Sequence, residues 1–129
     1  MNKDYLAMMD EGELEAYAKV LGFTTAAAQT AADKAKLIEK KRARCAELTV
    51  LGIAMSIPVK RAHDRRFIDV MNKEDRTTEE LDGAFRFLLG DEQYASLMDA
   101  VTEDDGTKDD DALGYAYNKL LYSAELKNF

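Results

Sequence analysis

The stretch that decides the fold is LTVLGIAMSIPV, residues Leu48 to Val59. Its apolar and β-branched residues lack helical spacing: Val50, Ile53, Met55 and Ile57. Gly52 lies near the middle of the stretch, and Pro58, the only proline of the chain, lies near its end. Such a run, bounded by turn residues, predicts a short β-hairpin. The hairpin lies between two basic clusters, and the back part of the chain is strongly acidic.

Length and composition predict an ordinary globular protein. A chain of 129 residues, 47% hydrophobic and 33% charged, fits one domain with at most a small appended module. Its single cysteine, Cys45, cannot form an internal disulfide, and the first residues lack the apolar run of a signal peptide. No stretch approaches the ~20 apolar residues of a membrane span. We therefore expect a soluble protein of a reducing cytoplasm.

Ahead of the hairpin, apolar residues recur at helical spacing. Residues 4–9 can begin a helix, and a second helix ends at Gly22, which suits a left-handed C-terminal cap. The apolar stripe of this second helix is Leu14, Tyr17, Ala18 and Leu21. A third, basic helix begins between Thr30 and Asp33 and extends to about Glu47, which places Cys45 on its inner face.

Behind the hairpin, local signals mark further helices. Asp64 is an N-cap for a short helix, and Thr77 with Glu80 has the spacing of a capping box. Gly90 ends the capping-box helix and Asp91 caps the next, while the last helix begins near residues 109–111. The apolar stripes of the last three helices are Leu81, Ala84, Phe85 and Leu88; Tyr94, Leu97, Met98 and Val101; and Leu113, Ala116, Tyr117, Leu120 and Ala124.

No residue pattern predicts catalysis, a cofactor or a metal site. Cys45 and His63 lie on opposite sides of the hairpin, and no orienting motif surrounds either of them. The acidic run around Gly106 fails as a calcium loop, because its first and twelfth positions are Val101 and Ala112, where carboxylates are required. We predict a solvated turn and a helix N-cap there, and a protein that is not an enzyme.

Two basic clusters flank the hairpin, within a chain whose net charge is −7. They comprise Lys34, Lys36, Lys40, Lys41, Arg42 and Arg44, and then Lys60, Arg61, Arg65 and Arg66. The clusters are either solvent-exposed helix faces, which the acidic chain favours, or one positive face that binds nucleic acid. Residues 77–129, with four Lys and Arg against 13 Asp and Glu, would repel nucleic acid.

The helices carry more aromatic residues than one face of each helix can bury. Phe87 and Tyr115 lie off the apolar stripes, so they are either exposed contacts for a partner or part of a more extensive core. We predict a protein-binding surface on the helix pair and the last helix, made of Phe85, Phe87, Leu88, Tyr94, Met98 and Tyr115.

From the hairpin onward, the sequence resembles the tail assembly chaperones of long-tailed bacteriophages and prophages. The resemblance covers about residues 47–129 and rests on LTVLGIAMSIP, the short helix before RTTEELDGAF, FRFLLGDEQYASLMDAV, EDDGTKDDDAL and the terminal LKNF. It implies a non-enzymatic protein of the bacterial host cytoplasm that binds the tape measure protein and tail-tube subunits during tail morphogenesis. Self-association is left open.

The front of the chain has a separate resemblance. YLAMMDEGELEAYAKVLGF and TAADKAKLIEKKRA, within about residues 5–44, are similar to the two-helix modules of the SAP and Rho N-terminal type, several of which bind nucleic acid. The run of alanines at residues 26–28 departs from the usual pattern and leaves the length of the connecting loop open. We therefore expect an N-terminal module over residues 1–46 and a hairpin-plus-helix body over residues 47–129. The predicted class is mainly α with one short β-hairpin (α+β), a compact bundle of short helices.

Overall fold

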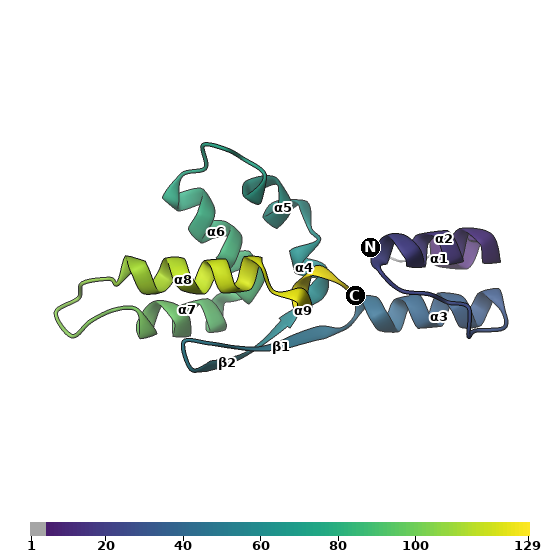
Figure 1. The fold of residues 1–129 in the computed structure, drawn as a ribbon, viewed down its shortest axis with the longest axis horizontal. Helices are drawn as coiled ribbons and strands as arrows, with labels where there is room; N and C mark the ends of the chain where they lie inside the picture. Colours follow the sequence, from purple (N-terminus) through teal and green to yellow (C-terminus); the bar gives the residue numbers. More distant parts are fainter. Residues whose placement is uncertain (1–4) are drawn as a thin grey trace. The chain divides into compact units, whose positions relative to one another are not determined.

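A computed structural model describes residues 5–129 as helices and one antiparallel hairpin (Figure 1), which confirms the predicted mainly-α, α+β class. The chain forms two compact units. Unit 1 contains residues 5–44 together with Asn128–Phe129, and unit 2 is Cys45–Lys127. The boundary at residues 44 and 45 lies two residues before the one expected from the sequence. No helix of residues 5–129 is both long and apolar enough to cross a membrane.

The hairpin comprises β1 (Cys45–Val50) and β2 (Ile53–Pro58), with Val50 paired to Ile53 and Cys45 paired to Pro58. The two-residue turn between the strands is Leu51–Gly52, and both residues have positive φ, 51° and 77°. Such a turn matches the twist of antiparallel strands, but leucine is unusual in the left-handed region. One face of the hairpin is buried through Ala46, Val50, Met55 and Ile57.

The predicted end of the basic helix was wrong. Helix α3 spans Ala31–Arg42, and residues 45–47 belong to β1. Cys45 is therefore an exposed strand residue and does not lie on the inner face of a helix. The reason is non-local: pairing with β2 extends along the whole length of β1, and the alternating burial of residues 45–50 follows from that pairing.

Unit 1 also contains α1 (Tyr5–Met8) and α2 (Glu11–Leu21). The first residue of the predicted 4–9 helix lies outside the described residues. Gly22 closes α2 at φ 99°, as predicted. Leu6, Leu14, Ala18, Leu21 and Ile38 form the apolar core of this unit.

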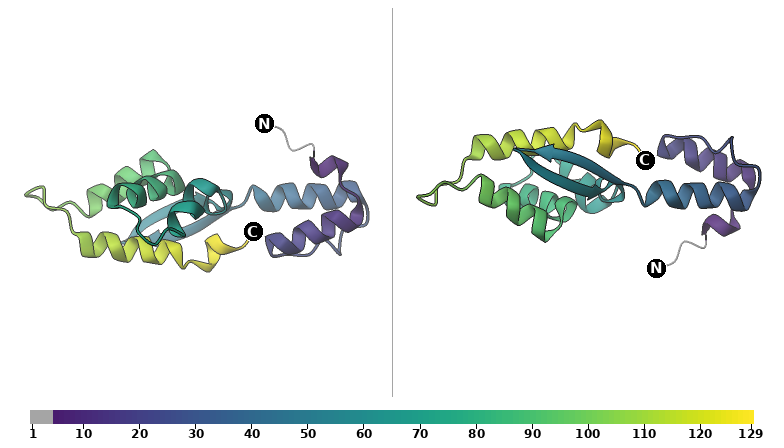
Figure 2. Two further views of the ribbon diagram at one scale, coloured as in Figure 1. Left: turned by 90° about the horizontal axis from the view of Figure 1, so that it is seen from above. Right: turned by 90° about the horizontal axis from the view of Figure 1, so that it is seen from below.

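In unit 2 the hairpin is followed by α4 (Val59–Ala62), α5 (Arg65–Met71), α6 (Thr78–Leu89), α7 (Asp91–Ala100), α8 (Asp110–Leu121) and α9 (Ala124–Lys127). Helix α7 packs beside β2, whereas α8 and α9 pack beside β1 (Figure 2). Ala124, predicted on the apolar face of the last helix, is exposed in α9, because α8 ends at Leu121.

Of the three N-caps that the sequence assigned to a named residue, two are confirmed. The Asp64 side chain accepts a hydrogen bond from the Arg66 amide, and Thr77 and Glu80 form the complete capping box. The third was wrong: the residue before α7 is Gly90, and Asp91 is the first residue of the helix. The carboxylate of Asp91 instead accepts a hydrogen bond from Arg86 Nε at 2.8 Å.

Three aromatic rings form the centre of unit 2. The Phe85 ring of α6 stacks on the Tyr117 ring of α8, with centroids 4.0 Å apart and planes within 4°. On α5, Phe67 meets the Phe85 ring edge-on, with the centroids 5.4 Å apart. Phe85 is fully buried, so α5 and α8 lie on either side of a ring supplied by α6.

Candidate functional site

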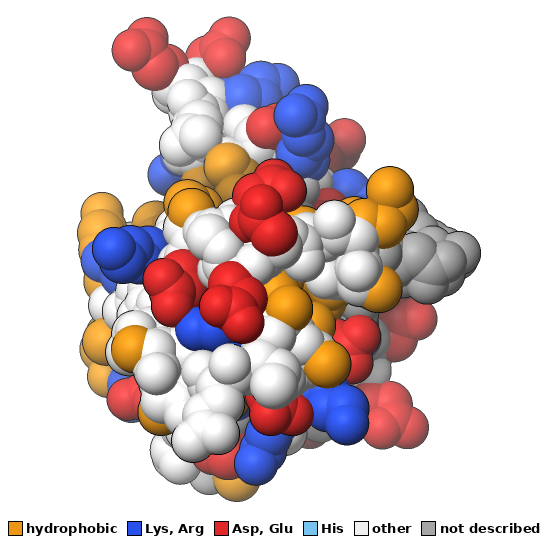
Figure 3. Space-filling model, turned by 90° about the vertical axis from the view of Figure 1, so that its right-hand side faces the viewer, with side chains coloured by type: hydrophobic (Ala, Val, Ile, Leu, Met, Phe, Trp, Pro, Cys, Tyr) orange, Lys and Arg blue, Asp and Glu red, His pale blue; other side chains and the backbone are white. Residues whose placement is uncertain are grey.

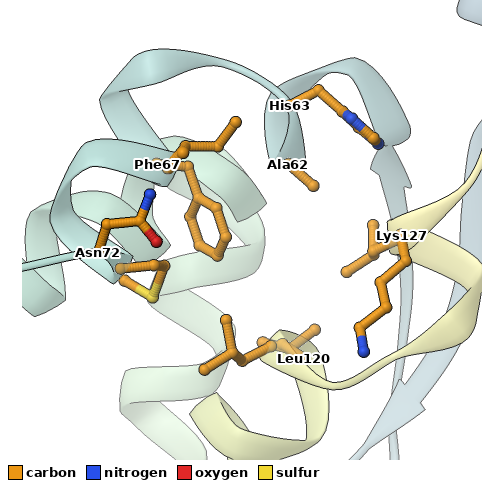
Figure 4. A pocket seen from close by; sticks show the side chains of 10 residues that line it. Ala62, His63, Phe67, Asn72, Leu120 and Lys127 are labelled. Atoms are coloured by element: carbon orange, nitrogen blue, oxygen red, sulfur yellow. The ribbon is translucent and has the colours of Figure 1, made fainter. Parts of the chain in front are cut away.

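A cavity of unit 2 lies between α4–α5 and α8–α9 and has a volume of about 250 Å³ (Figure 4). Seven of its ten lining residues are apolar: Ala62, Phe67, Ile68, Met71, Leu120, Leu121 and Leu126. The polar lining residues are His63, Asn72 and Lys127, which are exposed. An apolar floor with polar groups at its margin is the usual arrangement of a binding site. We call this space the first cavity.

A second cavity of about 180 Å³ lies beside the first and shares two residues with it, Met71 and Leu121. Its lining adds the stacked Phe85 and Tyr117 rings, with Leu81, Arg76, Gly114 and Asn118. The first cavity is lined by residues along α5 and by the end of α8, whereas the second is lined by the end of α5 and by earlier residues of α8. The chain therefore runs in opposite directions along the cavities in these two helices. We call the two cavities together the α5–α8 groove.

The fully charged side chains that line the groove are cations although the protein is acidic. The only fully charged residues among those that line it are Lys127, in the first cavity, and Arg76, in the second. Lys127 lies over the Tyr122 ring, 5.7 Å from its centroid. Arg76 donates a hydrogen bond to the Met71 carbonyl at 3.0 Å. A guanidinium has five N–H donors, so Arg76 retains donors for a ligand.

Tyr117 keeps the floor of the second cavity neutral. Burial raises the pKa of its hydroxyl, and hydrogen bonds to Asp82 and Tyr94 raise it further. The hydroxyl donates to Asp82 Oδ1 at 2.8 Å. Because the phenol stays protonated at neutral pH, this part of the groove presents uncharged aromatic surface.

The predicted partner surface is only partly at the surface. Phe85 and Leu88 are fully buried, so assigning them to a contact surface was wrong: residues on a helical stripe face the core. Tyr94 and Met98 are half-buried on α7. Phe87 is also half-buried, with the Arg66 guanidinium 4.1 Å from its ring centroid.

Tyr115, the remaining residue of that set, is 55% exposed on α8. Tyr122 is 70% exposed and follows α8 directly. Of the predicted set, Phe85 alone lines the groove, as part of its floor.

The predicted nucleic-acid residues are divided between the two units, since residues 34–44 belong to unit 1 and residues 60–66 to unit 2. Lys34 is 4% exposed, and its Nζ donates to Glu15 Oε1 at 2.7 Å and to the Thr25 carbonyl at 3.3 Å. Including Lys34 in a surface that binds phosphate was therefore wrong. The hydrogen bond from Lys34 lowers the pKa of Glu15, which keeps this carboxylate ionised.

Several other basic residues make internal contacts. Arg42 donates to the Tyr17 hydroxyl at 2.9 Å and lies over the Phe129 ring, and Arg44 donates to the Asn128 carbonyl. Lys41 lies 5.7 Å from the Phe23 ring centroid, and Arg61 donates a long hydrogen bond to the Leu88 carbonyl. Lys36, Lys40, Lys60 and Arg65 are exposed. Figure 3 shows basic and acidic side chains interspersed on the face that it draws.

Arg66 pairs with Asp64 through Nε and Nη2, at 3.1 and 3.0 Å. The hydrogen bonds from the Arg66 side chain and amide lower the pKa of Asp64 to about 2. Arg66 is thus held by a carboxylate on one side and covers Phe87 on the other, so this pair is part of the local structure of α5.

Within residues 5–129, no group of three His, Cys, Asp or Glu side chains is arranged to hold a metal ion. The acidic run forms a closed turn in which Thr102 pairs with Lys108 and Gly106 has φ 86°. Asp109 then caps α8 by accepting from the Ala112 amide at 3.0 Å.

Sequence reasoning missed the groove and the side chain that fixes the hairpin. The sequence of α5 contained a signal for the groove. Phe67, Ile68 and Met71 are more apolar side chains than one buried face of a seven-residue helix accounts for. Gln93 gave none. Its amide holds β2 through Ser56, accepting from the backbone N–H at 2.7 Å and donating to the carbonyl at 2.9 Å.

Comparison of the chain with protein-family models, with curated proteins and with solved structures found no match in any of the three. The function proposed below rests on the residues of the chain and on their arrangement.

Proposed function

We propose that this protein is a tail assembly chaperone of a bacteriophage or prophage, which binds the tape measure protein and tail-tube subunits in the cytoplasm of the bacterial host. In this proposal the protein acts by binding and catalyses no reaction. The resemblance of residues 47–129 supports it, because the hairpin, short helix, helix pair, acidic turn and last helix occur in unit 2 in that order.

The observation that carries the proposal is the α5–α8 groove. A chaperone of a long helical protein must cover apolar side chains that would otherwise associate with one another, and a groove between helices suits an amphipathic helix. At about 250 Å³, the first cavity is smaller than the roughly 300–1,000 Å³ typical of sites for drug-sized ligands. It therefore suits individual side chains of a protein better than a separate small molecule.

Nucleic-acid binding is the less favoured function. Lys34 is buried against Glu15, so this cation is not available to neutralise a phosphate, and Asp64 offsets part of the charge of Arg66. Binding through the remaining exposed lysines and arginines would weaken steeply with salt. Retention on DNA at low salt, lost on addition of salt, would support this alternative.

The test is co-expression of the full chain with the tape measure protein and the tail-tube protein of the same phage or prophage. We expect the tape measure protein to become soluble and to co-purify with this chain. Ala62→Phe, which fills the first cavity, should reduce co-purification, whereas Ala95→Phe, the same change at an exposed position of α7, should not. A tape measure protein that stays insoluble and unbound beside folded wild-type chain would contradict the proposal.

A further inference from the structure

We infer that the α5–α8 groove selects an amphipathic helix whose apolar side chains are flanked at both ends by acidic residues. This inference deepens the proposed function and rests on it only in taking the ligand to be a protein helix. It concerns the chemistry of the ligand, which the groove itself specifies.

Each of the two cavities of the groove is lined by one cationic side chain. Lys127 lies at the end formed by α9 and the start of α5, where His63 also lines the cavity. Arg76, which follows α5 in the chain, lines the second cavity. In Figure 4, His63 and Lys127 border the same side of the first cavity, and Asn72 lies on the opposite side. The two ends of the groove therefore carry one full positive charge each.

The lining of the groove contains no carboxylate. None of the residues that line either cavity is Asp or Glu. This is notable in a chain of net charge −7, whose residues 77–129 contain only four Lys and Arg. Across an interface, charge complementarity sets specificity more than affinity. A helix with acidic ends is matched to the groove, and a helix with basic ends would place like charges together at both ends.

The apolar lining of the groove surrounds two adjoining spaces. Met71 and Leu121 lie between the two cavities, so the groove offers two adjacent spaces for side chains rather than one. Successive apolar side chains on one face of a helix, at i and i+3 or i+4, are adjacent in the same way. Met71 has a flexible, polarisable side chain, which lets the partition between the spaces adapt to different ligands.

The experiment uses synthetic peptides and the full chain. Peptides of about 15 residues are long enough to form helix. Two of them carry leucine at i, i+3, i+4 and i+7; of these, one has glutamates at both ends and the other has lysines at both ends. A third has the acidic composition in scrambled order. We expect the acidic-ended peptide to bind at least about fivefold more tightly than the other two, since each partly exposed ion pair contributes modestly.

Two variants test the groove itself. Arg76→Glu with Lys127→Glu should invert the preference between the acidic-ended and basic-ended peptides. The matched control, Lys60→Glu with Arg65→Glu, makes the same change of net charge at exposed residues outside the groove and should preserve the preference. Equal affinities for the two peptides, or an unchanged preference in the Arg76 and Lys127 variant, would overturn the inference.

A second measurement needs no variant. In a protein labelled at its methionine methyl groups, the acidic-ended peptide should shift the NMR signal of Met71 and leave that of Met8, an exposed methionine of unit 1, unchanged. A peptide that binds without shifting the Met71 signal would place the site elsewhere. Because this assay contains no tape measure protein, it can succeed where the chaperone proposal fails, and the co-expression experiment can succeed where the groove inference fails.

Discussion

The replacement of Gln93 by glutamate tests how the hairpin is held against α7. The Gln93 amide makes three hydrogen bonds: it accepts from the Ser56 N–H at 2.7 Å and donates to the carbonyls of Ser56 and Leu89 at 2.9 and 2.7 Å. A glutamate of nearly the same shape keeps the acceptor but loses both donors. At neutral pH its carboxylate also faces two carbonyl oxygens.

The size of the effect follows from these contacts. Two lost hydrogen bonds cost about 0.5–1.5 kcal/mol each. Position 93 is the third residue of α7, where the helix dipole stabilises an acidic side chain by about 0.3–1 kcal/mol. The expected net loss is therefore about 1–2 kcal/mol at pH 7. Since the folded state disfavours the carboxylate, the pKa of the introduced carboxyl group should lie above its unfolded value, and the loss should shrink as the pH falls below about 5.

The assay is NMR hydrogen exchange of the Ser56 amide, which reports opening of the hairpin edge without requiring the two units to unfold together. Protection should fall about tenfold at pH 7, because about 1.4 kcal/mol corresponds to a factor of ten, and should recover in part at acidic pH. Gln29→Glu, the same change at an exposed residue of unit 1, is the control. A loss of protection that is independent of pH, or equal in the control, would refute the reasoning.

Three further predictions concern the stability of the chain. Thr77→Ala removes the capping-box acceptor for the Glu80 amide and should lower the free energy of unfolding by about 1 kcal/mol, measured by urea denaturation. Thr77→Ser keeps the hydroxyl and should retain most of the wild-type stability. Equal losses in the two variants would contradict the cap. Leu51→Asn relieves the backbone strain of a leucine at φ 51° and should raise the melting temperature, because it adds about 0.5–1 kcal/mol to the free energy of unfolding. An unchanged or lower melting temperature would argue against strain at this turn. The third prediction concerns Glu15, whose pKa is lowered by its hydrogen bond from Lys34. This ion pair stabilises the fold above pH 4.5, the ordinary pKa of a glutamate, and the stabilisation is lost on acidification. The wild type should accordingly lose more stability than Glu15→Gln in melts below about pH 4.5, and parallel pH profiles would show that the pair contributes nothing.

The features that the sequence predicted well are local. The capping box of Thr77 and Glu80, the N-cap Asp64 and the left-handed Gly22 each depend on residues within a few positions of one another. The end of α3 could not be found in this way. Whether residues 43–47 continue a helix or begin a strand is decided by pairing with β2, up to Pro58.

The candidate site was harder to predict than the fold for a related reason. Helical periodicity identifies the face that a helix buries, so it selected Phe85 and Leu88, which lie in the core. A groove consists of apolar side chains that the fold fails to cover, and α5 and α8 are about 50 residues apart in the chain. Only their arrangement in space shows that Met71 and Leu121 face a common cavity.

Three aromatic rings border the groove: Phe67 lines the first cavity, and Phe85 and Tyr117 line the second. Phe67 meets the Phe85 ring edge-on and Tyr117 stacks on it, so the Phe85 ring of α6 contacts rings from both α5 and α8. Ala62 and Gly114, both among the lining residues, have side chains too small to fill the space above the rings. Protein interiors are otherwise packed nearly as densely as organic crystals, so unfilled space bordered by large side chains is a specific feature of this core. The buried Phe85 ring, which cannot contribute to the rim of a partner surface, therefore lines the space that we propose accepts a partner's side chains.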